Sequence, residues 1–219
     1  YYILVPYAQA YVRAANVGGT PSLLKSIAIN VAKKPRLALK AVLATFLLNP
    51  SKFIELFIAN ELISYIDVLP KSNVKAILLH EVLTELITAF NLTHTLKYLV
   101  KAVEKDLDVP LGLETRNITH VYRWLKRNDT YIEYVMTPMN PLGYQMACNK
   151  EEAERAIESL AKENTKIIAI NILASGAISL ENAITYLDQY KSVIYGVVSA
   201  SIRPSRILEN FKKLRKLVC

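Results

Sequence analysis

Glycine is scarce in this sequence. Only six glycines occur among 219 residues, and none lies between Gly19 and Gly112. Because the tight turns of all-β folds commonly use glycine, this gap argues against an all-β fold and indicates a largely helical first third. The glycine motifs that hold phosphates or expose a nucleophile are also missing, namely Gly-x-Gly-x-x-Gly, the loop that ends in Gly-Lys-Ser/Thr, and Gly-x-Ser-x-Gly.

Cysteine is nearly absent. The two that occur, Cys148 and Cys219, are too few for a disulfide framework and lack metal-ligand spacing, so we expect no bound metal. Uncharged apolar runs such as Ala41–Leu48 fall far below the roughly 18 residues of a membrane-spanning helix. No cleavable leader is visible, so the sequence predicts a cytoplasmic protein that does not bind membranes.

The positive charge is distributed unevenly. Of the net charge of +8, +6 lies in residues 1–80, which contain nine Lys and Arg residues and three Asp and Glu residues. Because these basic residues are interleaved with Leu, Ile, Ala and Val, the pattern is typical of amphipathic helices with solvated basic faces. We therefore expect helices over about 20–64 and no nucleic-acid partner, and we regard these helices as a candidate surface for a homo-oligomer.

A regular alternation begins at Val74. Apolar runs at 74–79, 109–113, 131–136, 166–173 and 193–198 alternate with helical patterns at 92–107, 118–127, 150–163, 179–190 and 204–218. Short apolar strands that alternate with helices predict βαβ units and a parallel sheet. Because no glycine-rich first turn supports an open doubly wound sheet, we favour the alternative, a TIM-type (β/α) barrel. We expect one domain over 1–219, irregular or truncated in residues 1–73.

In such a barrel, functional groups project from the carboxyl ends of the strands. The turns after the last two strands commonly form an anion site from backbone N–H groups and a helix N-terminus. The predicted catalytic residues are His80, Glu114, Arg116 and Asn140, and the predicted anion site contains Ser175, Gly176, Ser199, Ser201 and Arg203. Structural interpretations stay open: His80 as a backbone-bonded histidine, Glu114 and Arg116 as an ion pair, and Asn140 as a turn residue.

Four segments resemble the aldo-keto reductase superfamily, in that family's order: residues 76–80, 134–142, 167–176 and 203–211. The last contains Pro204-Ser-Arg-Ile-Leu-Glu-Asn-Phe211, which is similar to the helix that holds the adenosine end of NADPH in those enzymes. The resemblance implies NADP(H) as cofactor, with Arg206 on the 2′-phosphate and Glu209 and Asn210 on adenine. It also implies that His80 orients a carbonyl substrate.

The sequence departs from that family in three places, one of which is Asn171, where relatives often have Lys or Ser-Pro. The family's tyrosine, aspartate and lysine motifs have no match in residues 1–73, and Glu114-Thr-Arg-Asn117 stands where the family usually has Ser-Asn. Three functions therefore stay open. The chain could be a reductase-like enzyme acting on a small carbonyl or phosphorylated, anionic metabolite. It could be a lyase or isomerase that uses Glu114, His80 or Glu81 as acid and base, or a catalytically inactive barrel that binds or assembles through residues 20–64.

Overall fold

The computed structural model of the chain describes residues 1–5, 73–147, 149–200 and 203–218. The helices expected at 20–64, with the oligomer surface assigned to them, and the predicted site residue Ser201 lie outside the described residues. The chain divides into two compact units, Tyr1–Leu111 and Gly112–Cys219. The single-domain organisation stays a prediction.

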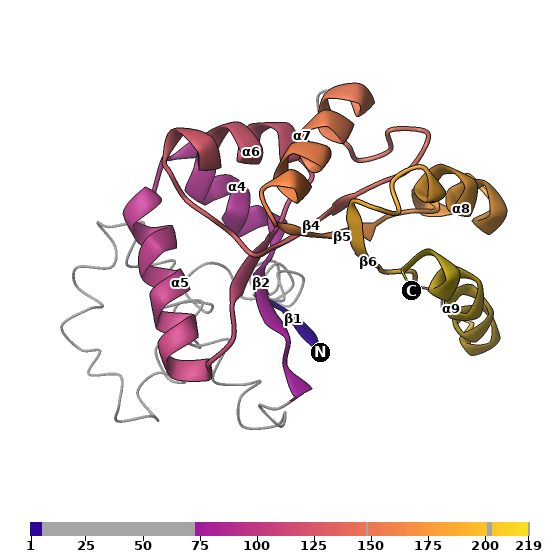
Figure 1. The fold of residues 1–219 in the computed structure, drawn as a ribbon, viewed down its shortest axis with the longest axis horizontal. Coiled ribbons are helices and arrows are strands. Elements are labelled where there is room, and N and C mark those ends of the chain that lie inside the picture. Colours follow the sequence, from indigo (N-terminus) through magenta and orange to yellow (C-terminus); the bar gives the residue numbers. More distant parts are fainter. Residues whose placement is uncertain (6–72, 148, 201–202, 219) are drawn as a thin grey trace, which may run out of the picture. The chain divides into compact units, whose positions relative to one another are not determined.

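The first unit contains a pair of parallel strands followed by two helices (Figure 1). Strand β1 (Tyr2–Val5) pairs with β2 (Ala76–Leu79), and the register runs from Tyr2 opposite Ala76 to Val5 opposite Leu79. All four side chains of β2 are buried, as expected of an apolar strand that is covered on both faces. Helices α4 (Glu81–Ala89) and α5 (Thr93–Leu107) follow.

Helix α4 is not predicted from the sequence. It begins directly after β2, and its N-cap is His80, whose Nδ1 accepts a hydrogen bond from the backbone N–H of Val82 at 3.3 Å. Helix starts are usually recognised from Ser, Thr, Asp or Asn at this position, so a histidine cap gives no clear signal. The helix buries Leu83 and Ile87, which lie one turn apart on one face.

The second unit repeats the strand–helix alternation that the sequence predicts (Figure 1). Strand β3 (Leu111–Glu114) leads into it. The elements that follow are α6 (Ile118–Arg127), β4 (Tyr134–Pro138), α7 (Lys150–Lys162), β5 (Lys166–Ile170), the short 3-10 turn η2 (Ala174–Gly176), α8 (Leu180–Asp188), β6 (Ile194–Val197) and α9 (Pro204–Val218). Each predicted boundary lies within a few residues of the observed one, so the α/β class is confirmed.

The strand order is β1-β2-β3-β4-β5-β6, and each pairing resolved between described strands is parallel. The longest register joins β4 to β5, from Tyr134 opposite Lys166 to Pro138 opposite Ile170. Strands β1 and β6 stand at the two ends of this order. The closed ring that a complete TIM-type barrel requires is therefore not formed by the described strands. The parallel, alternating part of the prediction holds.

The helices of the second unit are positioned by caps and apolar faces. Helix α7 begins at Asn149, whose Oδ1 accepts a hydrogen bond from the N–H of Glu152 at 2.7 Å, and it buries Ala153, Ala156, Ile157 and Leu160. Two acidic residues in its first turn suit the positive end of the helix dipole. None of the described helices is long and apolar enough to cross a bilayer.

Asn149→Ala is expected to lower the free energy of unfolding by about 1 kcal/mol, because the substitution removes the acceptor for an N–H of the first turn of α7. Chemical denaturation followed by circular dichroism measures this change. Asn182→Ala serves as the control, since Asn182 is exposed inside α8 and caps no helix. Equal stability of the two variants would contradict the assignment of Asn149 as a stabilising cap.

Candidate functional site

A cleft of about 870 Å³ opens in the second unit at the carboxyl ends of its strands. Glu114 and Ile170, the last residues of β3 and β5, line it together with Val198, which directly follows β6. The segment between β5 and α8, the turn after β6, and helices α8 and α9 contribute most of the remaining wall. This volume lies in the range of roughly 300–1,000 Å³ that small-molecule and cofactor sites occupy.

The cleft, which we call the α9 cleft, brings together many of the residues predicted from the sequence. Those at its wall are Glu114, Ser175, Gly176, Ser199, Arg206, Glu209 and Asn210. Arg116, Asn140 and Arg203 do not line it, and His80 belongs to the first unit. The placement follows from topology, because the carboxyl ends of neighbouring parallel strands meet at one edge of a sheet.

One face of α9 points into the cleft. Arg206, Glu209, Asn210 and Lys213 all line the cleft, and their spacing of three, four and seven residues places them on one side of an α-helix. Leu214 of the same helix is buried on another side. The residues that the resemblance assigns to NADPH therefore share one surface with the cleft.

Lys213 and Arg206, the cationic side chains that line the cleft in the described part of the chain, differ in their surroundings. Lys213 Nζ lies 2.9 Å from Glu181 Oε1 and 3.0 Å from Glu209 Oε1. The hydrogen bonds to Glu181 and then Glu209 raise the pKa of Lys213, so its positive charge is held between two carboxylates. For Arg206, by contrast, the described part of the chain provides no ion pair or hydrogen bond to the guanidinium, and the side chain is exposed at the cleft wall.

The N-terminus of α8 already carries a negative charge. Ser179 caps this helix by accepting a hydrogen bond from the N–H of Asn182 at 3.1 Å. Glu181 follows in the first turn, and its pKa is lowered chiefly by the hydrogen bond from Lys213 and then by its own backbone N–H. A second anion at the same helix end would be repelled by this carboxylate. An anionic ligand is therefore better accommodated near Arg206.

The turn after β5 has an unusual backbone. Ala174, Ser175 and Gly176 have consecutive positive φ angles of 46°, 59° and 89°. A left-handed conformation costs a residue other than glycine about 1–2 kcal/mol, and such strain is often found beside functional sites. The N–H of Gly176 donates to the carbonyl of Leu173 at 2.8 Å, so it is already used within the turn and is not available to hold an anion as the sequence predicted.

Asn140 has a structural position. Its side chain is fully buried, at 0% exposure. Its Nδ2 donates to the carbonyls of Tyr144 at 2.9 Å and Asn171 at 3.3 Å, and its Oδ1 accepts from the N–H of Tyr144 at 2.8 Å. The amide of Asn171 in turn donates to the side chain of Gln145. Asn140 thus fixes the loop after β4 and ties it to the end of β5, which matches the interpretation of this residue as a turn residue.

Glu114 and Arg116 differ in their exposure. Glu114 is the last residue of β3, and its side chain is buried at 8% exposure at the cleft wall, whereas Arg116 lies beyond the strand and is exposed. Strand alternation stops at Glu114, because the Thr115 hydroxyl accepts a hydrogen bond from the N–H of Asn117 at 2.9 Å and the chain turns into α6. The strand alternation from which the same-side placement is predicted therefore ends before Arg116.

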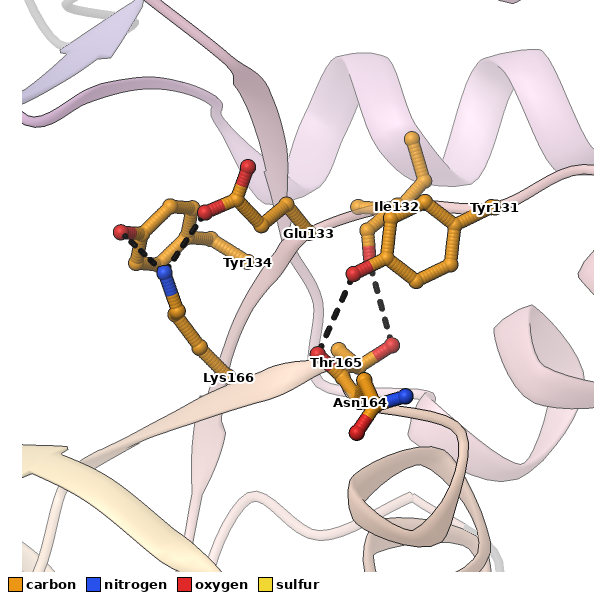
Figure 2. A network of polar contacts seen from close by, with 7 residues as sticks. All are labelled: Tyr131, Ile132, Glu133, Tyr134, Asn164, Thr165 and Lys166. Carbon is orange, nitrogen blue, oxygen red and sulfur yellow. Dashed lines mark hydrogen bonds and ion pairs between the residues drawn. The ribbon is translucent and has the colours of Figure 1, made fainter.

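Figure 2 shows a polar network at the amino ends of β4 and β5, which the sequence did not reveal. Lys166 Nζ lies 2.7 Å from Glu133 Oε1 and donates to the Tyr134 hydroxyl at 3.1 Å. The ammonium group also lies 4.8 Å from the ring centroid of Tyr134 and 5.4 Å from that of Tyr195. Such cation–π contacts further favour the charged form of a lysine.

This network joins strands and does not activate a nucleophile. The hydrogen bonds to Glu133 and then to Tyr134 raise the pKa of Lys166, so its amine stays protonated near neutral pH. Tyr134 and Lys166 face each other in the β4–β5 register. Nearby, Thr165 donates to the carbonyl of Ile132 at 2.9 Å, and Tyr131 donates to the carbonyl of Asn164 at 3.1 Å (Figure 2). These bonds hold β4 against β5 at the end opposite the cleft.

In the described part of the chain, no group of three or more His, Cys, Asp and Glu side chains is arranged to hold a metal ion. No known family model, curated protein or solved structure matches this chain. The chemistry of the α9 cleft is therefore argued from its own residues.

Proposed function

We propose that this chain binds a small phosphate-bearing molecule in the α9 cleft, with Arg206 as the principal phosphate ligand. One observation carries the proposal: Arg206 has no carboxylate partner among the described residues, whereas Lys213, the other cation at the wall, is held by two. A guanidinium offers a planar fork of charged donors that suits a phosphate group.

The candidate cofactor is NADP(H), as the resemblance to aldo-keto reductases implies. Two observations support this proposal: the cleft has a suitable volume, and the exposed Arg206 lines its wall. Glu209 and Asn210 share its face but already contact Lys213 and Ser199. Bound in this cleft, NADPH would supply hydride for the reduction of a carbonyl group. We propose accordingly that the chain is a reductase-like α/β protein that binds its cofactor at the carboxyl ends of its parallel strands.

A second candidate function is that of a lyase or isomerase acting on a phosphorylated substrate. The observation that favours it is the carboxyl group of Glu114, which is buried at the cleft wall on the end of β3. A carboxyl group held at the edge of a ligand cleft can serve as general acid or base. In this case Arg206 would hold the substrate phosphate, and Glu114 would transfer a proton to or from the substrate.

Calorimetric titration of the full chain with NADPH, NADH, 2′,5′-ADP and 5′-AMP tests the proposal. We expect NADPH to bind at least about tenfold more tightly than NADH, and 2′,5′-ADP more tightly than 5′-AMP by a similar factor, because one charge-assisted contact contributes about 1.5–3 kcal/mol. Equal affinities within each pair would contradict a 2′-phosphate site at Arg206. Binding of phosphorylated sugars without binding of either nucleotide would favour the lyase or isomerase.

A further inference from the structure

Ser199 lies in the segment that connects β6 to α9. Ser199 is buried at 8% exposure, and it lines the α9 cleft. Its Oγ accepts a hydrogen bond from Asn210 Nδ2 at 3.0 Å, so a residue of α9 holds a residue of the turn after β6. Asn210 is itself only partly exposed and lies four residues after Arg206 on the same face of the helix.

A serine hydroxyl group has one proton to donate and two lone pairs to accept with. Asn210 donates to one lone pair, so this bond leaves the Ser199 proton unused. Among the described residues, the Ser199 hydroxyl has this single hydrogen bond. A buried donor without an acceptor is unfavourable, and most such groups in proteins are satisfied by a partner or by water. The cleft is the side from which an acceptor can approach.

We propose that Ser199 donates this proton in a hydrogen bond to an anionic oxygen of the ligand, and that Asn210 is a positioning residue that directs it. The inference rests on the proposed function, because it assumes that the ligand carries a phosphate. It changes the role of Asn210 from the one that the resemblance implies, which is contact with adenine. In this arrangement Asn210 acts through Ser199.

The arrangement also defines which ligands the cleft accepts. Arg206 offers only donors to the ligand, and Ser199 offers its proton while the Asn210 amide takes one of its two lone pairs. An anionic oxygen can accept a hydrogen bond from both residues. This pair therefore favours a deprotonated phosphate, whose charge also attracts the guanidinium.

A double-mutant cycle with 2′,5′-ADP as the probe tests the inference by calorimetry on the full chain. We expect Ser199→Ala to weaken binding about tenfold, equivalent to about 1.4 kcal/mol, and Asn210→Ala to weaken it by nearly as much. The double variant should bind no more weakly than Ser199→Ala alone, because Asn210 acts only through the hydroxyl. Asn210→Asp should weaken binding further, since a carboxylate would take the serine proton and repel the phosphate.

Asn182→Ala is the matched control, because Asn182 is exposed on α8 and does not line the cleft. Additive losses in the cycle, or full binding by Asn210→Ala, would overturn the role of Asn210 while the phosphate site at Arg206 stands. If the unmodified chain binds neither 2′,5′-ADP nor phosphorylated sugars, both proposals are overturned. If Asn210→Ala does not fold, Asn210→Leu, which is close in volume, gives the same comparison.

Discussion

Arg206→Glu is expected to lower the affinity of the chain for NADPH by at least about a hundredfold. The substitution removes a charge-assisted contact of about 1.5–3 kcal/mol and places a carboxylate near the phosphate, whose repulsion adds about 1 kcal/mol in a solvated cleft. Affinity for NADH should change much less, because NADH lacks the 2′-phosphate. Calorimetry at low ionic strength measures both affinities, and added salt should narrow the difference between the variant and the unmodified chain.

Arg215→Glu is the matched control for this experiment. Arg215 is an exposed arginine of α9 that does not line the cleft, so its reversal changes the net charge of the chain by the same amount. A similar loss of NADPH affinity in both variants would show that binding depends on the net charge of the chain. If NADPH binds at a local site around Arg206, only Arg206→Glu should weaken NADPH binding strongly.

The second large effect is expected from Asn140→Asp, which should lower the free energy of unfolding at neutral pH by about 3–5 kcal/mol. In the native chain, Asn140 Nδ2 donates to two carbonyl oxygens at a fully buried position. An ionised aspartate would place a negative oxygen against those carbonyls without a donor between them. A buried charge that lacks a partner is among the costliest changes that one substitution can make.

The loss of unfolding free energy caused by Asn140→Asp should depend on pH in a defined direction. Burial against two acceptors raises the pKa of the introduced aspartate above its unfolded value of about 3.9. Below that value the carboxyl group is protonated in both states and can donate to one carbonyl, so most of the stability returns. The deficit then grows as pH rises from about 4 to the folded pKa and is constant above it. Urea denaturation between about pH 3.5 and 7.5 measures this profile.

Asn182→Asp provides the comparison for Asn140→Asp, because Asn182 is exposed on α8. The Asn182→Asp variant should unfold with nearly the same free energy as the unmodified chain, and the difference should not grow as pH rises. A stable Asn140→Asp variant that loses only ligand binding would contradict the structural role of Asn140. It would restore the catalytic interpretation that the sequence suggested for this residue.

The secondary structure after residue 73 could be predicted because it depends on local patterns. Runs such as Lys166–Ile170 are apolar at nearly every position, and the apolar residues of α6 recur at helical spacing. Helix α4 escaped prediction because its cap is His80. Ring closure could not be decided from local patterns, since it depends on which strands stand at the ends of the sheet.

The site could be predicted in part for the same reason. Arg206, Glu209 and Asn210 lie on one helix, so their common face follows from spacing alone. The bonds that decide their roles join distant segments, such as Lys213 to Glu181 across 32 residues and Asn210 to Ser199 across the turn into α9. Sequence spacing gives no measure of those distances. Gly176 shows a further limit, because its N–H is used inside a turn of unexpected left-handed geometry.

The network around Lys166 fastens β4 and β5 at their amino ends, whereas the α9 cleft lies at the carboxyl ends of the strands. Cleft residues on α9 and in the turn after β6 can therefore be exchanged without altering these amino-end contacts between β4 and β5. For protein engineering, this separation makes the wall formed by α9 and the turn after β6 a suitable region for randomised libraries aimed at new anionic ligands. The amino-end tyrosines, the lysine and the glutamate are best left unchanged.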